Sequence, residues 1–348
     1  MSRPASDDAA RSKAIQDSEP GSAIIGADVG GTYARLGWTR LDGNGALSVR
    51  GFRKYTCAEH PSLAAILRDY ADWLARETDA PPIAHAVVAI AGVLDGDGNT
   101  LLNTNLAWPV SLAATRRESG MQTLELINDF VAVAQAMAHA EADSLHLICG
   151  DPEQVAPGPA VVLGPGTGLG VAVYLPGGKP SVLPSEAGHA ALAGSSALEQ
   201  DVLRLLSRRY THIDNERILS GPGLITLYTC LCELRGSVPQ WQSPAELVAA
   251  ARSGSDVLAT ESVDVFCAWL GSLAGDLALT FGARAVYLTG GTTGHISDFL
   301  HAGGFQQRFL AKDRLSQALR HVPVWRVEHG ELGVLGALAW HVDKRTAR

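Results

Sequence analysis

The 348-residue sequence has only five cysteines, no run of lysine or arginine, and no apolar run approaching the ~20 residues that cross a bilayer. The cysteines are odd in number and scattered, so they predict neither a disulfide framework nor a zinc site. The net charge is -8, and without a clustered positive surface we expect no nucleic-acid partner. These absences favour a cytoplasmic protein with reduced thiols and no membrane partner.

Residues 1–22 lack the apolar core of a signal peptide, and we expect them to form a disordered leader. Two nucleotide fingerprints are also missing. A Walker A loop needs Ser or Thr after Gly-Lys, whereas Pro180 follows Gly178-Lys179. The G-x-G-x-x-G spacing fails because Val171 stands where the third glycine would fall. A nicotinamide dehydrogenase is therefore disfavoured.

Strand, glycine turn and strand occur in that order twice. Residues 23–29 and 34–39 flank Gly30-Gly31-Thr32, with a third strand expected over 47–55, and residues 160–163 and 171–175 flank the glycine-rich stretch 164–170. Helical spacing over 62–77 predicts a helix that buries Leu63, Ile66, Leu67, Tyr70 and Leu74. Helices dominate from 195 to 282, and residues 257–281 are long and apolar enough to lie between two lobes.

The duplicated pattern predicts an α/β protein with two lobes and a central cleft. The expected small domain comprises residues 23–139 plus 330–348, and the expected large domain comprises 140–329. Ligands are commonly bound in clefts of that kind.

Three strand-terminal glycine turns are candidate phosphate sites. The first holds Asp28, Gly30, Gly31 and Thr32, where two glycines allow backbone N–H groups to approach an anion and Asp28 is placed to orient a hydrated Mg²⁺. A plain hairpin is the alternative for this segment. Gly166-Thr167-Gly168 and Gly290-Gly291 offer two further turns. Each is weak alone, and the three together favour one nucleotide site.

Polar pairs at the ends of other strands are candidates for acid–base chemistry or for sugar binding. Asn128-Asp129 suits a helix N-cap, or a catalytic base with an asparagine on a neighbouring hydroxyl. Glu186 and His189 suit adjacent sugar hydroxyls, with a metal pair or a surface turn as the alternative. Glu216 and Asn105 are unremarkable by themselves.

In order along the chain, these segments read DVGGTYARL, TNLAW, INDF, GTGLGVA, PSEAGH, NERILSGPGL, LTGGT and GVLGAL. The set resembles the bacterial glucokinase family of the hexokinase/actin-like ATPase superfamily, from about Ile24 to Leu338. The absence of a cysteine-rich zinc motif favours its zinc-free branch.

This resemblance implies an ATP- and Mg²⁺-dependent kinase that phosphorylates the 6-hydroxyl of glucose, with Asp129 as the catalytic base. It implies that the sugar is held by Asn105, Asn128, Glu186, His189 and Glu216. It also places the phosphates and Mg²⁺ at Asp28, Gly30, Gly31 and Thr32, with Gly166, Thr167 and Gly168 opposite, and the adenosine towards Gly290 and Gly291. Homodimerisation is a further expectation from the family.

Two residues depart from the family pattern. Tyr33 stands where a smaller polar residue, commonly asparagine, is usual, and Ala187 replaces a common glycine. Two alternatives to a glucokinase therefore stay open: a sugar-binding regulator without catalysis, and a kinase of another hexose. Neither the sugar range nor the choice between ATP and polyphosphate follows from the sequence.

Overall fold

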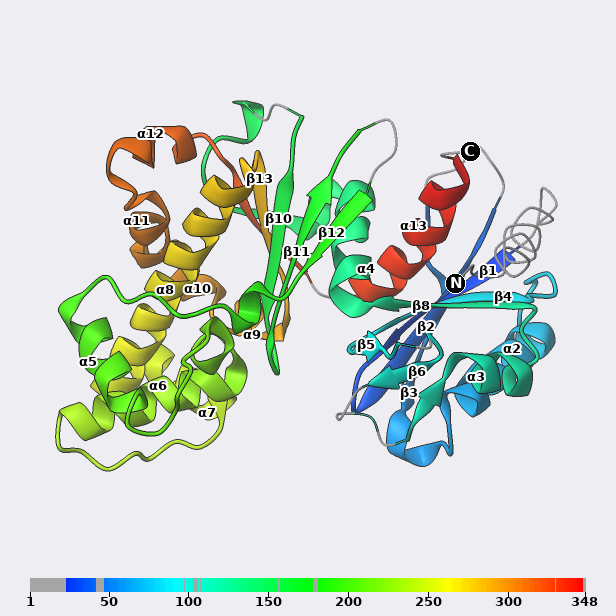
Figure 1. Cartoon of the computed structure of the whole chain (residues 1–348), viewed down its shortest axis with the longest axis horizontal. Helices are drawn as coiled ribbons and strands as arrows, with labels where there is room; N and C mark the ends of the chain where they lie inside the picture. Colours follow the sequence, from blue (N-terminus) through cyan, green and yellow to red (C-terminus); the bar gives the residue numbers. More distant parts are fainter. Residues whose placement is uncertain are drawn as a thin grey trace, which may run out of the picture. The chain divides into compact units, whose positions relative to one another are not determined.

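The computed structural model describes residues 23–41, 47–96, 98–102, 106, 108–154, 157–177, 181–328 and 330–346. The chain forms two compact units (Figure 1). Unit 1 comprises the described residues up to His139 together with those from Glu331 onward, and unit 2 comprises Ala140–Gly330.

Unit 1 is built on a five-stranded sheet in the order β3-β2-β1-β4-β8. Its strands are β1 (Ala23–Val29), β2 (Tyr33–Arg40), β3 (Arg50–Thr56), β4 (His85–Ile90) and β8 (Thr123–Asn128). The first three strands are antiparallel neighbours, as the glycine-turn pattern predicts, while β4 runs parallel to β1 and β8 parallel to β4. The carboxyl ends of β1, β4 and β8 therefore lie at one edge of the sheet.

Helices cover both faces of this sheet (Figure 1). One face packs on α2 (Leu63–Glu77), whose five predicted core residues are all buried, beside α3 (Leu112–Ser119). The other face packs on α4 (Asp129–Ala136) and α13 (Leu332–Thr346). A small antiparallel sheet of β5 (Val93–Leu94), β6 (Thr100–Leu102) and β7 (Val110–Ser111) completes the unit and was not predicted.

Unit 2 repeats the same strand order. Its sheet runs β12-β11-β10-β13-β14-β9, formed by β9 (Leu145–Cys149), β10 (Ala160–Pro165), β11 (Leu169–Leu175), β12 (Ser181–Ser185), β13 (Ala285–Leu288) and β14 (Val324–Val327). The strands β10, β11 and β12 are antiparallel neighbours, and β13 and β14 continue in parallel from β10. The added edge strand β9 runs antiparallel to β14.

The helices of unit 2 are α5 (Ala197–Leu206), α6 (Gly221–Leu234), α7 (Pro244–Ser253), α8 (Val257–Phe281), α9 (Gly291–His295), α10 (Ser297–His301), α11 (Gly304–Leu310) and α12 (Ser316–Leu319). Among the described helices, α8 alone has the length and apolar composition to cross a membrane. Phe266, Trp269 and Leu270 of this helix are buried in the core of unit 2 against its other helices.

Short 3₁₀ helices link these elements: η1 (Cys57–Glu59), η2 (Met137–His139), η3 (Ala142–Ser144), η4 (Pro152–Gln154), η5 (Ala187–His189), η6 (Asn215–Arg217) and η7 (Asp313–Leu315). All five cysteines are free and buried, so the expected reduced thiols are confirmed. Burial raises the pKa of the Cys149 thiol to about 12 and that of Cys230 to about 11. Both thiols are therefore poor nucleophiles at neutral pH.

Candidate functional site

The first glycine turn connects β1 to β2, and its backbone is held by hydrogen bonds from Gly30 and Cys57. The Gly30 amide donates to the carbonyl of Tyr33 at 2.9 Å. Cys57, buried beneath the turn, donates its amide to the Thr32 carbonyl at 2.9 Å and its thiol to the Gly30 carbonyl at 3.3 Å. Gly31 and Thr32 are exposed, and their amides donate to no group in the described part of the chain. Two N–H donors are therefore presented outward, as an anion site requires.

Asp28 lies beside this turn at the end of β1. Its Oδ2 accepts from Arg35 Nη1 at 3.2 Å, because the β1–β2 register pairs these two residues. A Cβ on Gly333 would stand 2.5 Å from the Asp28 carboxyl carbon, so the first turn of α13 lies directly on this carboxylate. The positive end of the helix dipole stabilises a negative charge there.

The geometry at Asp28 bears on the predicted metal role. Arg35 occupies one carboxylate oxygen, and the Asp28 side chain is 16% exposed. Across the described residues, no group of three His, Cys, Asp or Glu side chains lies close enough to hold a metal ion. The arrangement fits an Mg²⁺ that is carried by phosphate oxygens and water, and it does not fit a protein cage.

Asn128 and Asp129 lie at the same edge of the unit 1 sheet as Asp28. The register aligns Asn128 with Ile90, and Ile90 with Val29, so two strand spacings of about 5 Å each separate the pair from the turn. The Asn128 Oδ1 accepts from the amides of Phe130 at 2.9 Å and Val131 at 3.2 Å, which makes this residue the N-cap of α4. Asp129 Oδ1 accepts from the Phe130 amide at 2.9 Å. The predicted base is therefore held in the first turn of α4.

α13 joins these two parts of unit 1 through glycines. Gly336 lies so close to α4 that an added Cβ would stand 1.8 Å from the Ala132 carbonyl oxygen, while Gly333 lies on Asp28. α13 therefore contacts both the strand that carries Asp28 and the helix that begins at Asp129. Sequence analysis did not assign these glycines a role, although their three-residue spacing places them on one helix face. Asn105 lies outside the described residues.

In unit 2, the second glycine turn is shorter than predicted. β10 continues to Pro165 and β11 starts at Leu169, which leaves only residues 166–168 as the turn. The Gly166 carbonyl accepts from the Gly221 amide at 2.7 Å, at the start of α6. Thr167 is exposed at the tip of this turn.

The third glycine segment meets the second. Gly290 has φ +87°, and a Cβ there would stand 2.5 Å from the Pro165 carbonyl oxygen, so only glycine fits. The predicted turn at Gly290-Gly291 was wrong in part, since α9 begins at Gly291. The two glycine segments assigned to the nucleotide therefore lie together within unit 2.

Glu216 contacts the second turn directly. Its Oε2 accepts from the Leu169 amide at 2.7 Å, and a Cβ on Gly168 would stand 2.4 Å from that oxygen. Gly188 packs on the Leu169 carbonyl, since an added Cβ would stand 2.2 Å from that oxygen. The Glu186–His189 segment therefore lies beside the same turn as Glu216. The structure thus gathers Glu186, His189 and Glu216 around one turn.

Two neighbouring residues that sequence analysis missed shape this group. Asp214 Oδ2 lies 3.5 Å from His189 Nδ1, and its Oδ1 accepts from the Arg217 amide at 2.8 Å. Asn215 donates its side-chain amide to the Ala187 carbonyl at 2.8 Å. Both precede Glu216 directly in the sequence, which was the available signal. Glu186 and His189 remain exposed.

Comparison with known proteins identifies the family of this chain. The glucokinase family model matches residues 25–344. A glucokinase-like protein of Xylella fastidiosa (strain 9a5c) is 39% identical over 327 residues, which are 93% of this chain and 96% of that protein. The crystal structure of a glucokinase from an Antarctic psychrotroph superposes with a TM-score of 0.80 at 30% identity, covering 92% of this chain and 98% of that one.

A more distant solved structure shows the fold alone. A ROK family glucokinase from Streptomyces griseus, in complex with glucose and AMPPNP, has a TM-score of 0.61 at 20% identity and covers 92% of this chain and 99% of its own. The predicted α/β fold of the hexokinase/actin-like ATPase type is confirmed. The chain belongs to the glucokinase family.

Proposed function

We propose that this chain transfers the γ-phosphoryl group of ATP to the 6-hydroxyl of glucose and so forms glucose 6-phosphate. One observation carries the proposal most directly. Within unit 1, the open amides of Gly31 and Thr32 and the carboxylate of Asp129 lie at the same edge of one sheet. Phosphoryl transfer needs an anchored phosphate chain and one carboxylate for the hydroxyl proton, and little else from the protein.

In this mechanism Asp129 accepts the proton of the 6-hydroxyl as the sugar oxygen attacks the γ-phosphorus. The bond between the γ-phosphorus and the β,γ-bridging oxygen breaks, and ADP leaves. Asn128 uses its Oδ1 to cap α4, so only its amide nitrogen serves a sugar hydroxyl. Glu186, His189 and Glu216 would bind further ring hydroxyls, together with Asn105.

The phosphates would be bound by backbone amides. Gly31 and Thr32 would donate in unit 1. In the Gly166–Gly168 turn of unit 2, the amides of Thr167 and Gly168 would serve the same role, since the Gly166 amide donates to the Gly168 carbonyl at 2.8 Å. Gly290 and Gly291 would lie towards the adenosine. Mg²⁺ would be held by ATP oxygens and by waters that Asp28 orients, and when bound it neutralises charge on the phosphates. Support for ATP comes from the shared fold, since the Streptomyces griseus neighbour was solved with AMPPNP.

The proposal is tested by a coupled assay of the purified chain with Mg²⁺, a panel of hexoses, and either ATP or polyphosphate. We expect activity with ATP and a clear preference for glucose over galactose and fructose, because buried polar groups left unpaired penalise a wrongly placed hydroxyl. Equal kcat/KM for the three sugars would rule out that preference.

The assignment of Asp129 as the catalytic base is tested by a separate variant. Asp129→Ala should lower kcat by about 10²–10⁴-fold, the usual contribution of a general base, while glucose still binds. Asp72→Ala, which removes an exposed carboxylate from α2, is the matched control and should keep wild-type kcat. Near-normal turnover by a folded Asp129→Ala protein would remove Asp129 from the mechanism. Sugar binding without turnover by the wild-type chain would instead favour a sugar-binding regulator.

A further inference from the structure

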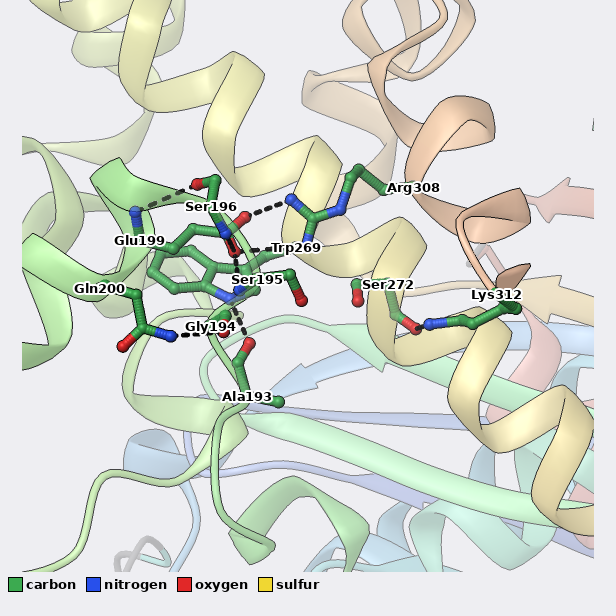
Figure 2. A network of polar contacts seen from close by, with 10 residues as sticks. All are labelled: Ala193, Gly194, Ser195, Ser196, Glu199, Gln200, Trp269, Ser272, Arg308 and Lys312. Carbon is green, nitrogen blue, oxygen red and sulfur yellow. Dashed lines mark hydrogen bonds and ion pairs between the residues drawn. The ribbon is translucent and has the colours of Figure 1, made fainter. Parts of the chain in front are cut away.

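The segment that follows His189 has almost no regular structure, yet its backbone is held by side chains. Residues 190–196 lead from η5 to α5, and most of them are exposed. Trp269 donates its indole N–H to the Ala193 carbonyl at 2.8 Å, and Gln200 donates its amide to the Gly194 carbonyl at 2.7 Å. Figure 2 shows both contacts converging on this segment from α8 and α5.

Glu199 supplies the remaining contacts. It is 1% exposed, and its Oε2 accepts from the amides of Ser195 at 2.6 Å and Ser196 at 3.1 Å. Arg308 of α11 pairs with the same carboxylate, with Nη1 2.6 Å from Oε1 and Nη2 3.2 Å from Oε2 (Figure 2). One buried carboxylate therefore ties the segment to both α5 and α11.

The ion pair of Glu199 and Arg308 is expected to add little to the free energy of unfolding. Burying two charges costs free energy that their attraction only partly returns, and apolar replacements of buried pairs are often neutral or stabilising. A buried pair whose hydrogen bonds end on the backbone of an exposed segment does, however, fix the conformation of that segment.

The fixed segment is paired with the residues proposed to bind sugar. The backbone amide of Asn215 donates to the Ala190 carbonyl at 2.9 Å, and the backbone amide of Leu192 donates to the Ile213 carbonyl at 2.9 Å. Ala191 forms an isolated antiparallel bridge with Asp214. A shift of residues 190–193 would therefore move His189, which directly precedes them. It would also move Glu216, because Asp214 and Asn215 are paired with the same residues.

We propose that Glu199 and Arg308 are positioning residues for sugar binding, acting through residues 190–196 on His189 and Glu216. This inference rests on the proposed function, because it concerns the sugar side of that reaction. Neither residue contacts the sugar in this proposal.

The main test is the double variant Glu199→Leu with Arg308→Leu, which replaces the pair by apolar side chains. We expect a Tm close to wild type, together with a KM for glucose raised about tenfold or more, since small displacements of binding groups cost that much. The KM for ATP should rise less than the KM for glucose, because Glu216 is the one displaced residue that contacts the turn at residues 166–168. An unchanged KM for glucose in the folded double variant would overturn the proposal.

A matched control lies just beyond the end of α11. Lys312 donates to the Ser272 carbonyl at 3.1 Å and pairs with Asp276 Oδ1 at 2.6 Å, without touching residues 190–196 (Figure 2). Lys312→Met should leave the KM for glucose unchanged. An equal rise in that KM would show that the effect reflects general loss of packing, and would overturn the positioning role.

Amide hydrogen exchange tests whether Glu199 and Arg308 fix residues 190–196, even if the wild-type chain phosphorylates no sugar. In the double variant, the amides of Ser195 and Ser196 should lose protection, and those of Leu192 and Asn215 should lose it with them. Loss confined to Ser195 and Ser196 would mean that the pair holds only its own loop. If the double variant does not fold, the isosteric single variant Glu199→Gln, which removes the charge that pairs with Arg308, should give the same exchange pattern. Unchanged protection in that variant would contradict the proposal.

Discussion

Asn128 caps α4, and we also propose that it binds the sugar. Its Oδ1 caps α4, so the amide nitrogen is the group left for a substrate hydroxyl. Asn128→Ser keeps a good capping oxygen and removes the amide, and we expect a stability within about 0.5 kcal/mol of wild type with weaker glucose binding. Asn128→Ala should lose both the capping oxygen and the amide, and loss of the cap should lower the free energy of unfolding by about 1 kcal/mol.

Thermal unfolding and glucose titration of these two variants separate the roles. If Asn128→Ser binds glucose as tightly as wild type, the residue is only a helix cap.

Tyr33 departs from the family pattern, and its surroundings suggest a role for a second residue. The ring is 37% exposed, and the Lys54 ammonium lies 3.5 Å from its centroid. Because Tyr33 directly follows Thr32, this ammonium is held close to the proposed phosphate turn. We expect Lys54→Gln to raise the KM for ATP about threefold to tenfold, as loss of one partly screened charge contact of about 1 kcal/mol implies.

Tyr33→Phe keeps the aromatic face and should leave that KM unchanged, so it serves as the control for Lys54→Gln. The effect of Lys54→Gln should shrink as salt is raised. A KM for ATP that is the same in Lys54→Gln and wild type at low salt would make the pair a surface contact only.

At the residue scale, the sequence predicts which side chains stand at strand ends, and it does not predict their partners. Asp28 and Asp129 were singled out because each stands at the end of a strand, but a hairpin and a helix N-cap suit the same residues, so the proposed role of Asp129 came from the family resemblance. Arg35 and Asp214 were missed because their contacts depend on strand register and on a 3₁₀ turn. Whether Asn128 caps a helix or binds sugar could not be decided from its type, since an asparagine suits both.

At the scale of elements, the contact between α13 and α4 permits no side chain at Gly336. Gly→Ala in a helix normally gains up to about 1 kcal/mol. Here the added methyl would stand 1.8 Å from the Ala132 carbonyl oxygen, and we expect Gly336→Ala to lower stability by about 2–3 kcal/mol because the two helices must separate.

Gly304→Ala is the matched control at the start of α11, where the nearest atom to an added Cβ is 4.0 Å away. Denaturant unfolding of both variants measures the difference. A Gly336→Ala protein as stable as the Gly304→Ala protein would show that α13 can shift away from α4 without loss.

Elements with a strong period were predictable. β1 matches its predicted limits, and α2 buries the five residues that its spacing indicated. β3 begins at Arg50, three residues after its predicted start. The short strands β5, β6 and β7 have too few residues to show a period, and β12 carries a proline, so their assignment depends on pairing partners elsewhere in the chain.

At the scale of the whole molecule, unit 2 is one continuous stretch of chain, whereas unit 1 needs the C-terminal helix α13. A fragment of residues 140–330 contains its whole sheet and core, and we expect it to unfold cooperatively on its own. A chain that ends at residue 330 exposes the face of Ile24, Val87 and Ala89 that α13 covers, and unit 1 should then be unfolded.

Circular dichroism and thermal scans of the fragment and of the shortened chain check both expectations. A noncooperative scan of the fragment would show that unit 2 depends on unit 1. Native-like exchange protection of β1 in the shortened chain would show that α13 is dispensable.

The position of α13 in the gene also orders events during translation. Domains generally fold as they leave the ribosome, and every residue of unit 2 is made before α13. Asp28 and Asp129 precede unit 2 in the chain, yet the helix that packs on Asp28 and on α4 follows it. A product that stops before α13 would then contain all of unit 2 and lack the helix that covers Asp28 and α4, so we expect it to be inactive.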